Sequence, residues 1–366
     1  MRRSTPTDAA TENRRAARHA LVVVGLAVLG AAAGGQALPR DPSSLGLPNP
    51  NPTVVRGWGE LPAGRTWGSS AAVDIGPDGE VWTYDRCGGN SCEGSALDPI
   101  LKFDHRNGKL LAAFGAGLLV FPHGLHVDGE GNVWVTDARA NSAGTKGHQV
   151  LKFSPDGTLL MALGKPGVPG NTRDTFNEPC DVITAPNGDI YVADGHSGQR
   201  IEDPTLNARI VKFDKSGRYL REWGRFGRGR GEFRTPHALA FDSRGRLFVA
   251  DRGNSRIQIF DPDGRFLEEW EQFGRVSDLF IDRQDNLFAI DSESGTPRNP
   301  GWSTGVRIGT AHANKVLAFI PPHRTAQAWG AAGEGVAVDS EGSVYAAEGP
   351  QSRDVAGGGI TKYAKR

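Results

Sequence analysis

A pattern that recurs six times along the chain constrains its fold more than any other feature. In each copy, a short strand, a turn and a second strand end at an acidic residue. The turns are centred on Gly79, Gly131, Gly188, Gly245, Asp285 and Gly342. The acidic residues follow six positions later, at Asp85, Asp137, Asp194, Asp251, Asp291 and Glu348. Fixed spacing in six copies predicts a tandem array of one structural unit.

The repeats also contain further strands, which define the architecture. A third strand rich in β-branched and aromatic residues is predicted at 100–103, 150–153, 210–213, 257–260, 316–319 and 360–363. A fourth strand follows in the first five copies, ending in the fifth at Trp329-Gly330, but the sixth copy stops at Arg366. Because residues 54–59 resemble residues 219–224, we expect the N-terminal segment to supply the missing outer strand. The chain is therefore predicted to be an all-β, six-bladed β-propeller whose last blade is closed by the N-terminal strand.

The N-terminal region differs in composition from the repeats. Several arginines precede the apolar run 20–33, which is short for a membrane-spanning helix and typical of an export signal. We predict a signal peptide or N-terminal anchor at 1–37, a proline-rich linker outside the fold at 38–52 and the propeller at 53–366. The protein is then expected to be exported to a periplasmic or extracellular space, with no stable membrane contact once the signal is cleaved.

Charge and cysteine content narrow the possible partners. The 42 basic residues equal the 42 acidic ones in number, so no overall field attracts nucleic acid, and we expect no nucleic-acid partner. We also expect the protein to be a monomer. Cys87 and Cys92 flank a short loop that a disulfide could close in an oxidising compartment. Cys180 is left over and is interpreted as a buried thiol or, if it faces a metal ion, an additional soft ligand.

The register of the repeats places a ring of residues at one end of the channel. In a propeller, the first strand of each blade lines the axis, so equivalent positions in the six copies encircle it. The residue eight before each turn, with a two-residue allowance in the first copy, is Ser69, His123, Cys180, His237, Ser277 or Glu334. His123, His237 and Glu334 come from alternate blades and are predicted to converge on one metal ion. Two histidines and a carboxylate suit zinc with an open position and equally suit Fe(II). The alternative is that each histidine only caps its strand through a backbone contact.

The repeats resemble the NHL family in the sequences at 190–195 and 247–257. The Pro-His pairs, the Asp-Arg after the first blade and the Asp-Gly after the third resemble peptidyl-α-hydroxyglycine α-amidating lyase, a zinc enzyme of that fold. The resemblance implies that His123 and His237 bind metal, that Arg86 binds a substrate carboxylate and that His196 takes the position of the family's catalytic tyrosine. Glu334 stands where the family has a third histidine. The aspartate that helps bind the family's calcium is absent, so the resemblance gives no support for calcium here.

Two functions are consistent with these residues. The favoured hypothesis is a metal-dependent lyase that cleaves a carbon–nitrogen bond of an α-hydroxyglycine-like substrate at the channel mouth, giving an amide and glyoxylate. In this interpretation Arg86 orients a small peptide-like or hydroxylated substrate and His196 acts as base. The alternative is a non-catalytic exported propeller that binds a protein, peptide or glycan.

Overall fold

The computed structural model describes residues 41–199, 201–295, 297–323, 333–349 and 358–365. The predicted signal or anchor at 1–37 and the predicted strand end at Trp329 lie outside the described residues. None of the described residues belongs to a helix long and apolar enough to cross a membrane.

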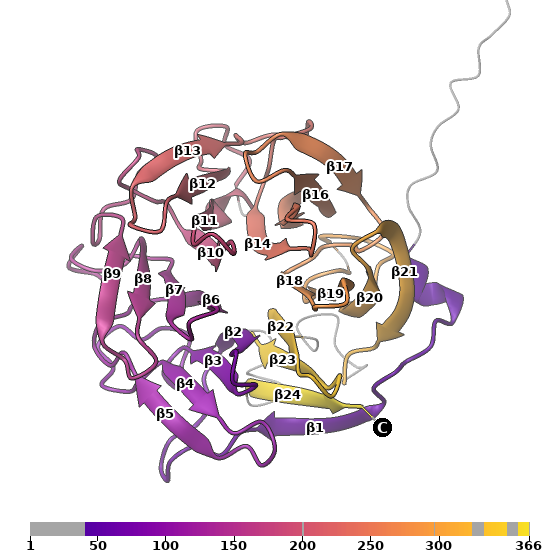
Figure 1. The fold of residues 1–366 in the computed structure, drawn as a ribbon, viewed down its shortest axis with the longest axis horizontal. Helices are drawn as coiled ribbons and strands as arrows, with labels where there is room; N and C mark the ends of the chain where they lie inside the picture. The colour runs from indigo at the N-terminus through magenta and orange to yellow at the C-terminus, as the bar shows by residue number, and fades with distance from the viewer. Residues whose placement is uncertain (1–40, 200, 296, 324–332, 350–357, 366) are drawn as a thin grey trace, which may run out of the picture. The chain divides into compact units, whose positions relative to one another are not determined.

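Six four-stranded antiparallel sheets surround a central axis as the blades of a propeller (Figure 1), which confirms the predicted fold. The strands of blades one and two are β2 (Ser70–Ile75), β3 (Val81–Asp85), β4 (Ile100–Phe103), β5 (Leu110–Phe114), β6 (Pro122–Val127), β7 (Val133–Asp137), β8 (Gln149–Phe153) and β9 (Leu159–Leu163). Those of blades three and four are β10 (Pro179–Thr184), β11 (Ile190–Asp194), β12 (Arg209–Phe213), β13 (Tyr219–Trp223), β14 (Pro236–Phe241), β15 (Leu247–Asp251), β16 (Arg256–Phe260) and β17 (Phe266–Trp270).

The last two blades complete the ring. Their strands are β18 (Asp278–Ile281), β19 (Asn286–Asp291), β20 (Gly305–Thr310), β21 (Ala313–Ile320), β22 (Gly335–Val338), β23 (Val344–Glu348), β24 (Gly359–Ala364) and β1 (Thr53–Trp58). The short 3-10 helices are η1 (Pro42–Leu45), η2 (His196–Gln199) and η3 (Arg252–Asn254). In blade six, β1 pairs antiparallel with β24, so the N-terminal strand forms the outer strand as the sequence predicts.

Blade five differs from the predicted strand assignment. The repeat pattern predicts its third strand at 316–319, with 292–313 as an insertion, but β20 lies within that insertion and pairs with β19. Residues 316–319 instead belong to the outer strand β21, which pairs with β20. Residues 305–310 form a strand because their side chains alternate between the two faces of the sheet. Val306 is buried in the core between blades five and six, while Arg307 points to the opposite face.

The segment predicted as a linker packs on the propeller over its described residues. The Asp41 carboxylate lies 2.8 Å from Nη2 of Arg307, and both side chains are almost completely buried. Asn51 donates a 2.9 Å hydrogen bond to the carbonyl of Tyr363 in β24. The prediction of a linker outside the fold is therefore wrong for these residues, because their polar groups complete hydrogen bonds that blades five and six leave open.

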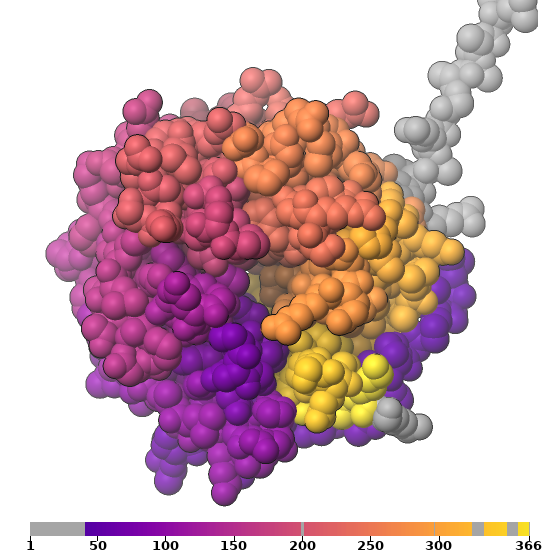
Figure 2. Space-filling view, viewed as in Figure 1, coloured from indigo at the N-terminus to yellow at the C-terminus, as the bar shows by residue number. Residues whose placement is uncertain are grey.

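Apolar side chains between adjacent blades form the core. Trp82 and Phe114 of blade one, for example, pack in one buried cluster with Leu125 and Phe153 of blade two. The inner strands β2, β6, β10, β14, β18 and β22 contact one another around the axis. They line a cavity of about 290 Å³, and the space-filling view shows a hollow at the centre of the ring (Figure 2). The fold thus places equivalent residues of different blades around one axis.

Candidate metal centre

Three buried histidines converge at the axis. His123 lies within β6 where its pairing with β7 is interrupted, His237 occupies the same position in β14, and His196 begins η2 after β11. Their ligand nitrogens all lie within 4.8 Å of one another. Among the described residues, Glu334 is not part of this group, so the structure brings His196, rather than Glu334, together with His123 and His237.

Hydrogen bonds fix the orientation of two of these rings. Nδ1 of His123 donates to the carbonyl of Cys180 at 2.8 Å, and Nδ1 of His237 donates to the carbonyl of Ser277 at 2.6 Å. In each case the acceptor residue occupies, in the first strand of the next blade, the position equivalent to that of the histidine. A histidine that donates from Nδ1 keeps its Nε2 lone pair for a metal. Both Nε2 atoms are buried and have no hydrogen-bond partner among the described residues.

The local backbone explains why these side chains point at the axis. The pairing of β6 with β7 skips from Pro122 to Leu125, and that of β14 with β15 skips from Pro236 to Ala238. A β-bulge of this kind turns a side chain away from its regular direction. Gly124 allows β6 to approach β10, since a Cβ atom there would lie 2.6 Å from the Cys180 carbonyl oxygen. The bulge and this close contact together make the His123 hydrogen bond possible.

His196 reaches the same point from a loop. Gly195 before it has a φ of 142°, and a Cβ atom there would lie 2.1 Å from the carbonyl oxygen of Asn207. The His196 main-chain N–H donates to the main-chain carbonyl of Glu178, and the Nδ1 atom of His196 lies 3.4 Å from the Glu178 carboxylate. Its Nε2 accepts from Nη2 of Arg252 at 3.1 Å. Glu178 therefore supports the ring from behind, as carboxylates commonly support metal-binding histidines.

Burial and neighbouring cations keep the imidazoles of His123 and His237 neutral. Burial, followed by the charges of Arg86 and Arg252, lowers the pKa of His123 to about 3. Burial and Arg252 also hold the pKa of His237 well below its usual value. Neutral imidazole is the form that binds metal ions. Zinc–nitrogen bonds of about 2.1 Å place tetrahedral ligand nitrogens roughly 3.4 Å apart, which small side-chain rotations would achieve here. The donor set therefore fits zinc or Fe(II).

Charged side chains surround the histidines. Glu334 is 7% exposed, and its Oε1 lies 3.7 Å from Nη1 of Arg252. Arg86 donates from Nε to the Pro122 carbonyl and from Nη1 to Asn90, with its guanidinium 4.0 Å from the Phe121 ring centroid. Among the described residues, none accepts a hydrogen bond from Nη2 of Arg86. Arg86, Arg252 and Glu334 thus lie beside the imidazoles, in addition to the Glu178 carboxylate next to His196.

Sequence reasoning did not identify Arg252, although a signal was present. Arg252 follows Asp251 in blade four as Arg86 follows Asp85 in blade one. Both arginines occupy the first position after the second strand of their blades, at the same end of the propeller. Comparison of the Asp-Arg pairs would therefore have placed Arg252 near the axis.

The cysteines contribute structure rather than ligands. Cys87 and Cys92 form a disulfide, as predicted. Cys180 is completely buried, and burial holds the pKa of its thiol well above the usual value. Its carbonyl oxygen, not its sulfur, contacts His123. Cys180 thus supports the centre through its main chain.

The fold and this centre define a six-bladed β-propeller with three buried histidines on its axis. Residues 233–260 match the family model described as NHL repeat. The chain is 38% identical over 166 residues to "Peptidylglycine alpha-amidating monooxygenase" of Rattus norvegicus, covering 43% of this chain and 15% of that protein. It is also 38% identical over 128 residues to "Peptidyl-alpha-hydroxyglycine alpha-amidating lyase 1" of Drosophila melanogaster, covering 34% and 20%. A third relative, "NHL repeat-containing protein 3" of Homo sapiens, is 39% identical over 138 residues, covering 36% and 37%.

These matches span well under half of each relative. Among solved structures, a gluconolactonase from Xanthomonas campestris has a TM-score of 0.56 at 17% identity, covering 88% of this chain and 93% of that one. This likeness concerns the fold alone. Two of these relatives are named as amidating enzymes.

Proposed function

We propose that the protein is an exported, metal-dependent lyase that cleaves the carbon–nitrogen bond of an α-hydroxyglycine-like substrate. The observation that carries the proposal is the pair of buried Nε2 atoms of His123 and His237, which face His196 without hydrogen-bond partners among the described residues. Unpaired buried polar atoms are costly, and a metal ion would satisfy both. We assign His123, His237 and His196 as the ligands, with zinc as the first candidate and Fe(II) as the second.

The surrounding residues suit the handling of a small carboxylate substrate. Arg86 is held by two of its nitrogens and by Phe121, so Nη2 can bind the substrate carboxylate. Arg252 lies between His196 and Glu334 and can turn from His196 toward Glu334 when His196 binds metal. A bound zinc ion would act as a Lewis acid that lowers the pKa of the substrate hydroxyl.

Glu334 is the residue that we assign to proton transfer, in place of His196. In the proposed step, its carboxylate takes the hydroxyl proton as the hydroxyl-bearing carbon forms a carbon–oxygen double bond. The carbon–nitrogen bond breaks, and its electron pair stays on the amide nitrogen. The protonated Glu334 then returns the proton to that nitrogen. The products are a primary amide and glyoxylate, so no oxidant or reductant is needed.

The disulfide supports the export part of the proposal. Bonds such as Cys87–Cys92 form and persist in oxidising compartments and are rare in the cytosol. The apolar segment at 20–33 would supply the signal.

Metal analysis and product analysis test the function together. Purified protein is expected to hold about one zinc or iron ion per chain and to release glyoxylate from an α-hydroxyglycine peptide. His123→Ala and His237→Ala are expected to lose both the metal and the activity. His126→Ala is the matched control, since His126 lies in the same strand but contacts Thr184 and Asp74 instead. Wild-type protein without stoichiometric metal, or metal-loaded protein without glyoxylate release, would reject the proposal.

A further inference from the structure

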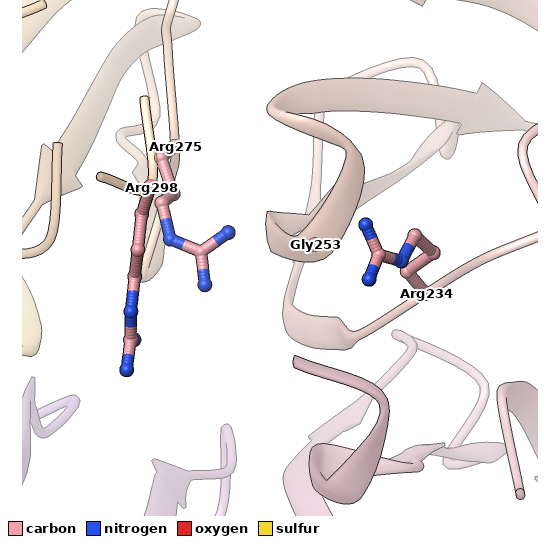
Figure 3. Close-up of a pocket in the computed structure, with 4 residues that line it drawn as sticks. All are labelled: Arg234, Gly253, Arg275 and Arg298. Carbon is pink, nitrogen blue, oxygen red and sulfur yellow. The ribbon is translucent and has the colours of Figure 1, made fainter. Parts of the chain in front are cut away.

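Three arginines line a small pocket next to the histidine centre. The pocket has a volume of about 160 Å³ and is lined by Arg234, Gly253, Arg275 and Arg298. The guanidinium groups of Arg234 and Arg275 face the same gap from opposite sides, with Arg298 beside Arg275 (Figure 3). None of the described residues that line it carries a carboxylate.

Around the pocket, the ion pairs between described residues join more arginines than carboxylates. Glu293 pairs with both Arg275, at 3.0 Å, and Arg298. Glu202 pairs with Arg234 at 2.8 Å and with Arg228 at 2.9 Å. In these pairs, four arginines share two carboxylates, and Glu202 is an exposed side chain whose charge water screens.

The acidity of Glu293 reflects the same excess. Burial alone would raise the pKa of its carboxyl, but the charges of Arg252, Arg275 and Arg298 outweigh burial and hold it at about 2. The field at this point therefore favours negative charge.

The pocket is connected to the histidine centre through one residue. Nη1 of Arg275 donates to the main-chain carbonyl of Arg252 at 2.9 Å, while the Arg252 side chain contacts His196. Gly253, the next residue, lines the pocket itself. A group bound in the pocket would thus lie next to η3, whose Arg252 contacts His196.

We propose that this pocket binds an acidic side chain of the substrate, so that the enzyme acts on peptide-like substrates with a carboxylate close to the reacting glycine. This inference rests on the proposed function and adds the class of substrate to it. Arg234 and Arg298 are the specificity-determining residues, since guanidinium groups bind carboxylates through paired hydrogen bonds. Arg275 positions the pocket through its contacts with Arg252 and Glu293.

Equilibrium binding tests the pocket without requiring turnover. The probes are two uncleavable dipeptides, acetyl-Glu-Gly and acetyl-Gln-Gly, measured by titration calorimetry with the metal-loaded protein. We expect the glutamate probe to bind at least about 10-fold more tightly, as a charge-assisted hydrogen bond gives. Arg234→Gln and Arg298→Gln should remove this preference, and Arg298→Lys should restore part of it. Arg218→Gln, on an exposed turn of blade three, is the control and should retain the preference.

Different outcomes separate this inference from the lyase proposal. A glutamate preference that depends on Arg234 and Arg298, in a protein that releases no glyoxylate, would retain the pocket and reject the lyase. Equal binding of the two dipeptides, or a preference that survives both glutamine substitutions, would reject the pocket whatever the activity. If a glutamine variant does not fold, shown by loss of its cooperative thermal transition, Arg298→Lys and the two probes with wild-type protein still decide the matter.

Discussion

His123 and His237 come from blades two and four, yet their ring centroids lie 4.8 Å apart at the axis. Each donates Nδ1–H to the main-chain carbonyl of the equivalent residue in the following blade, Cys180 for His123 and Ser277 for His237. The two side chains therefore have equivalent hydrogen-bond environments. The repeated structure therefore produces a matched pair of metal-binding nitrogens. His196 reaches the pair from a loop and makes the centre three-sided.

The different surroundings of His196 and Glu334 predict different effects of substitution. His196→Ala should lower metal content, because it removes one of three converging nitrogens. Glu334→Gln should retain the metal but slow glyoxylate release by about 100-fold or more, as expected for loss of a group that transfers a proton. Metal content by mass spectrometry and kcat measured on the same preparations check both. Loss of metal from Glu334→Gln with retention in His196→Ala would favour the ligand set predicted from sequence.

Gly124→Ala should weaken the centre without touching a histidine. The added methyl group would lie 2.6 Å from the Cys180 carbonyl oxygen, so β6 and β10 must separate and the His123 hydrogen bond lengthens. We expect a loss of roughly 1–3 kcal/mol in the free energy of unfolding, typical of overpacking, and weaker metal binding. Urea unfolding and zinc titration measure the two effects. Gly129→Ala is the control, because nothing lies within 4 Å of its new methyl group, and an equal effect there would contradict the explanation.

Asp41→Ala should destabilise blade five although Asp41 lies before the first strand. Arg307 is completely buried between Asp41 and Asp291, and removal of one carboxylate leaves part of its charge without compensation. The free energy of unfolding is expected to fall by about 3 kcal/mol, as for other broken buried ion pairs. Denaturant unfolding measures this change. Arg218→Ala, which breaks an exposed pair with Asp214 and leaves the turn hydrogen bonds of that aspartate in place, should have little effect. Equal losses in both variants would count against a structural role for 41–52.

Asp137 should make stability depend on pH. The equivalent aspartates of blades three and four pair with Arg209 and Arg256, whereas Asp137 has no ion pair among the described residues. Burial raises its pKa to about 7 despite hydrogen bonds from backbone N–H groups. The folded protein therefore holds a proton that the unfolded chain releases near pH 4. The resulting stabilisation is complete below pH 4 and is lost as the pH rises to 7, by about 1.4 kcal/mol for each unit of pKa difference.

The measurement for Asp137 is the free energy of unfolding between pH 4 and pH 8. Asp137→Asn should reduce the decline over this range, because asparagine does not titrate. A decline of the same size in wild type and variant would exclude Asp137 as its source.

The sequence by itself determined the blade count, the closing strand and the position of the centre. Turn glycines and the acidic residues that end strands recur at fixed spacing. This spacing predicts the blades because nearly every blade is formed by consecutive residues. The same register placed His123 and His237 at equivalent points of their strands. It did not determine blade five, where β20 lies in a segment that matches the repeat poorly.

Only the tertiary structure decided which third side chain joins the two histidines. Glu334 shares their register, but its carboxylate faces Arg252, whereas His196 is turned to the axis by Gly195 and supported by Glu178. The direction of a side chain at a bulge or a loop depends on neighbouring residues from other blades, and the spacing of the repeats does not predict those contacts. The arginine pocket has the same origin, because Arg234, Arg275 and Arg298 are far apart along the chain and meet only where blades four and five pack together.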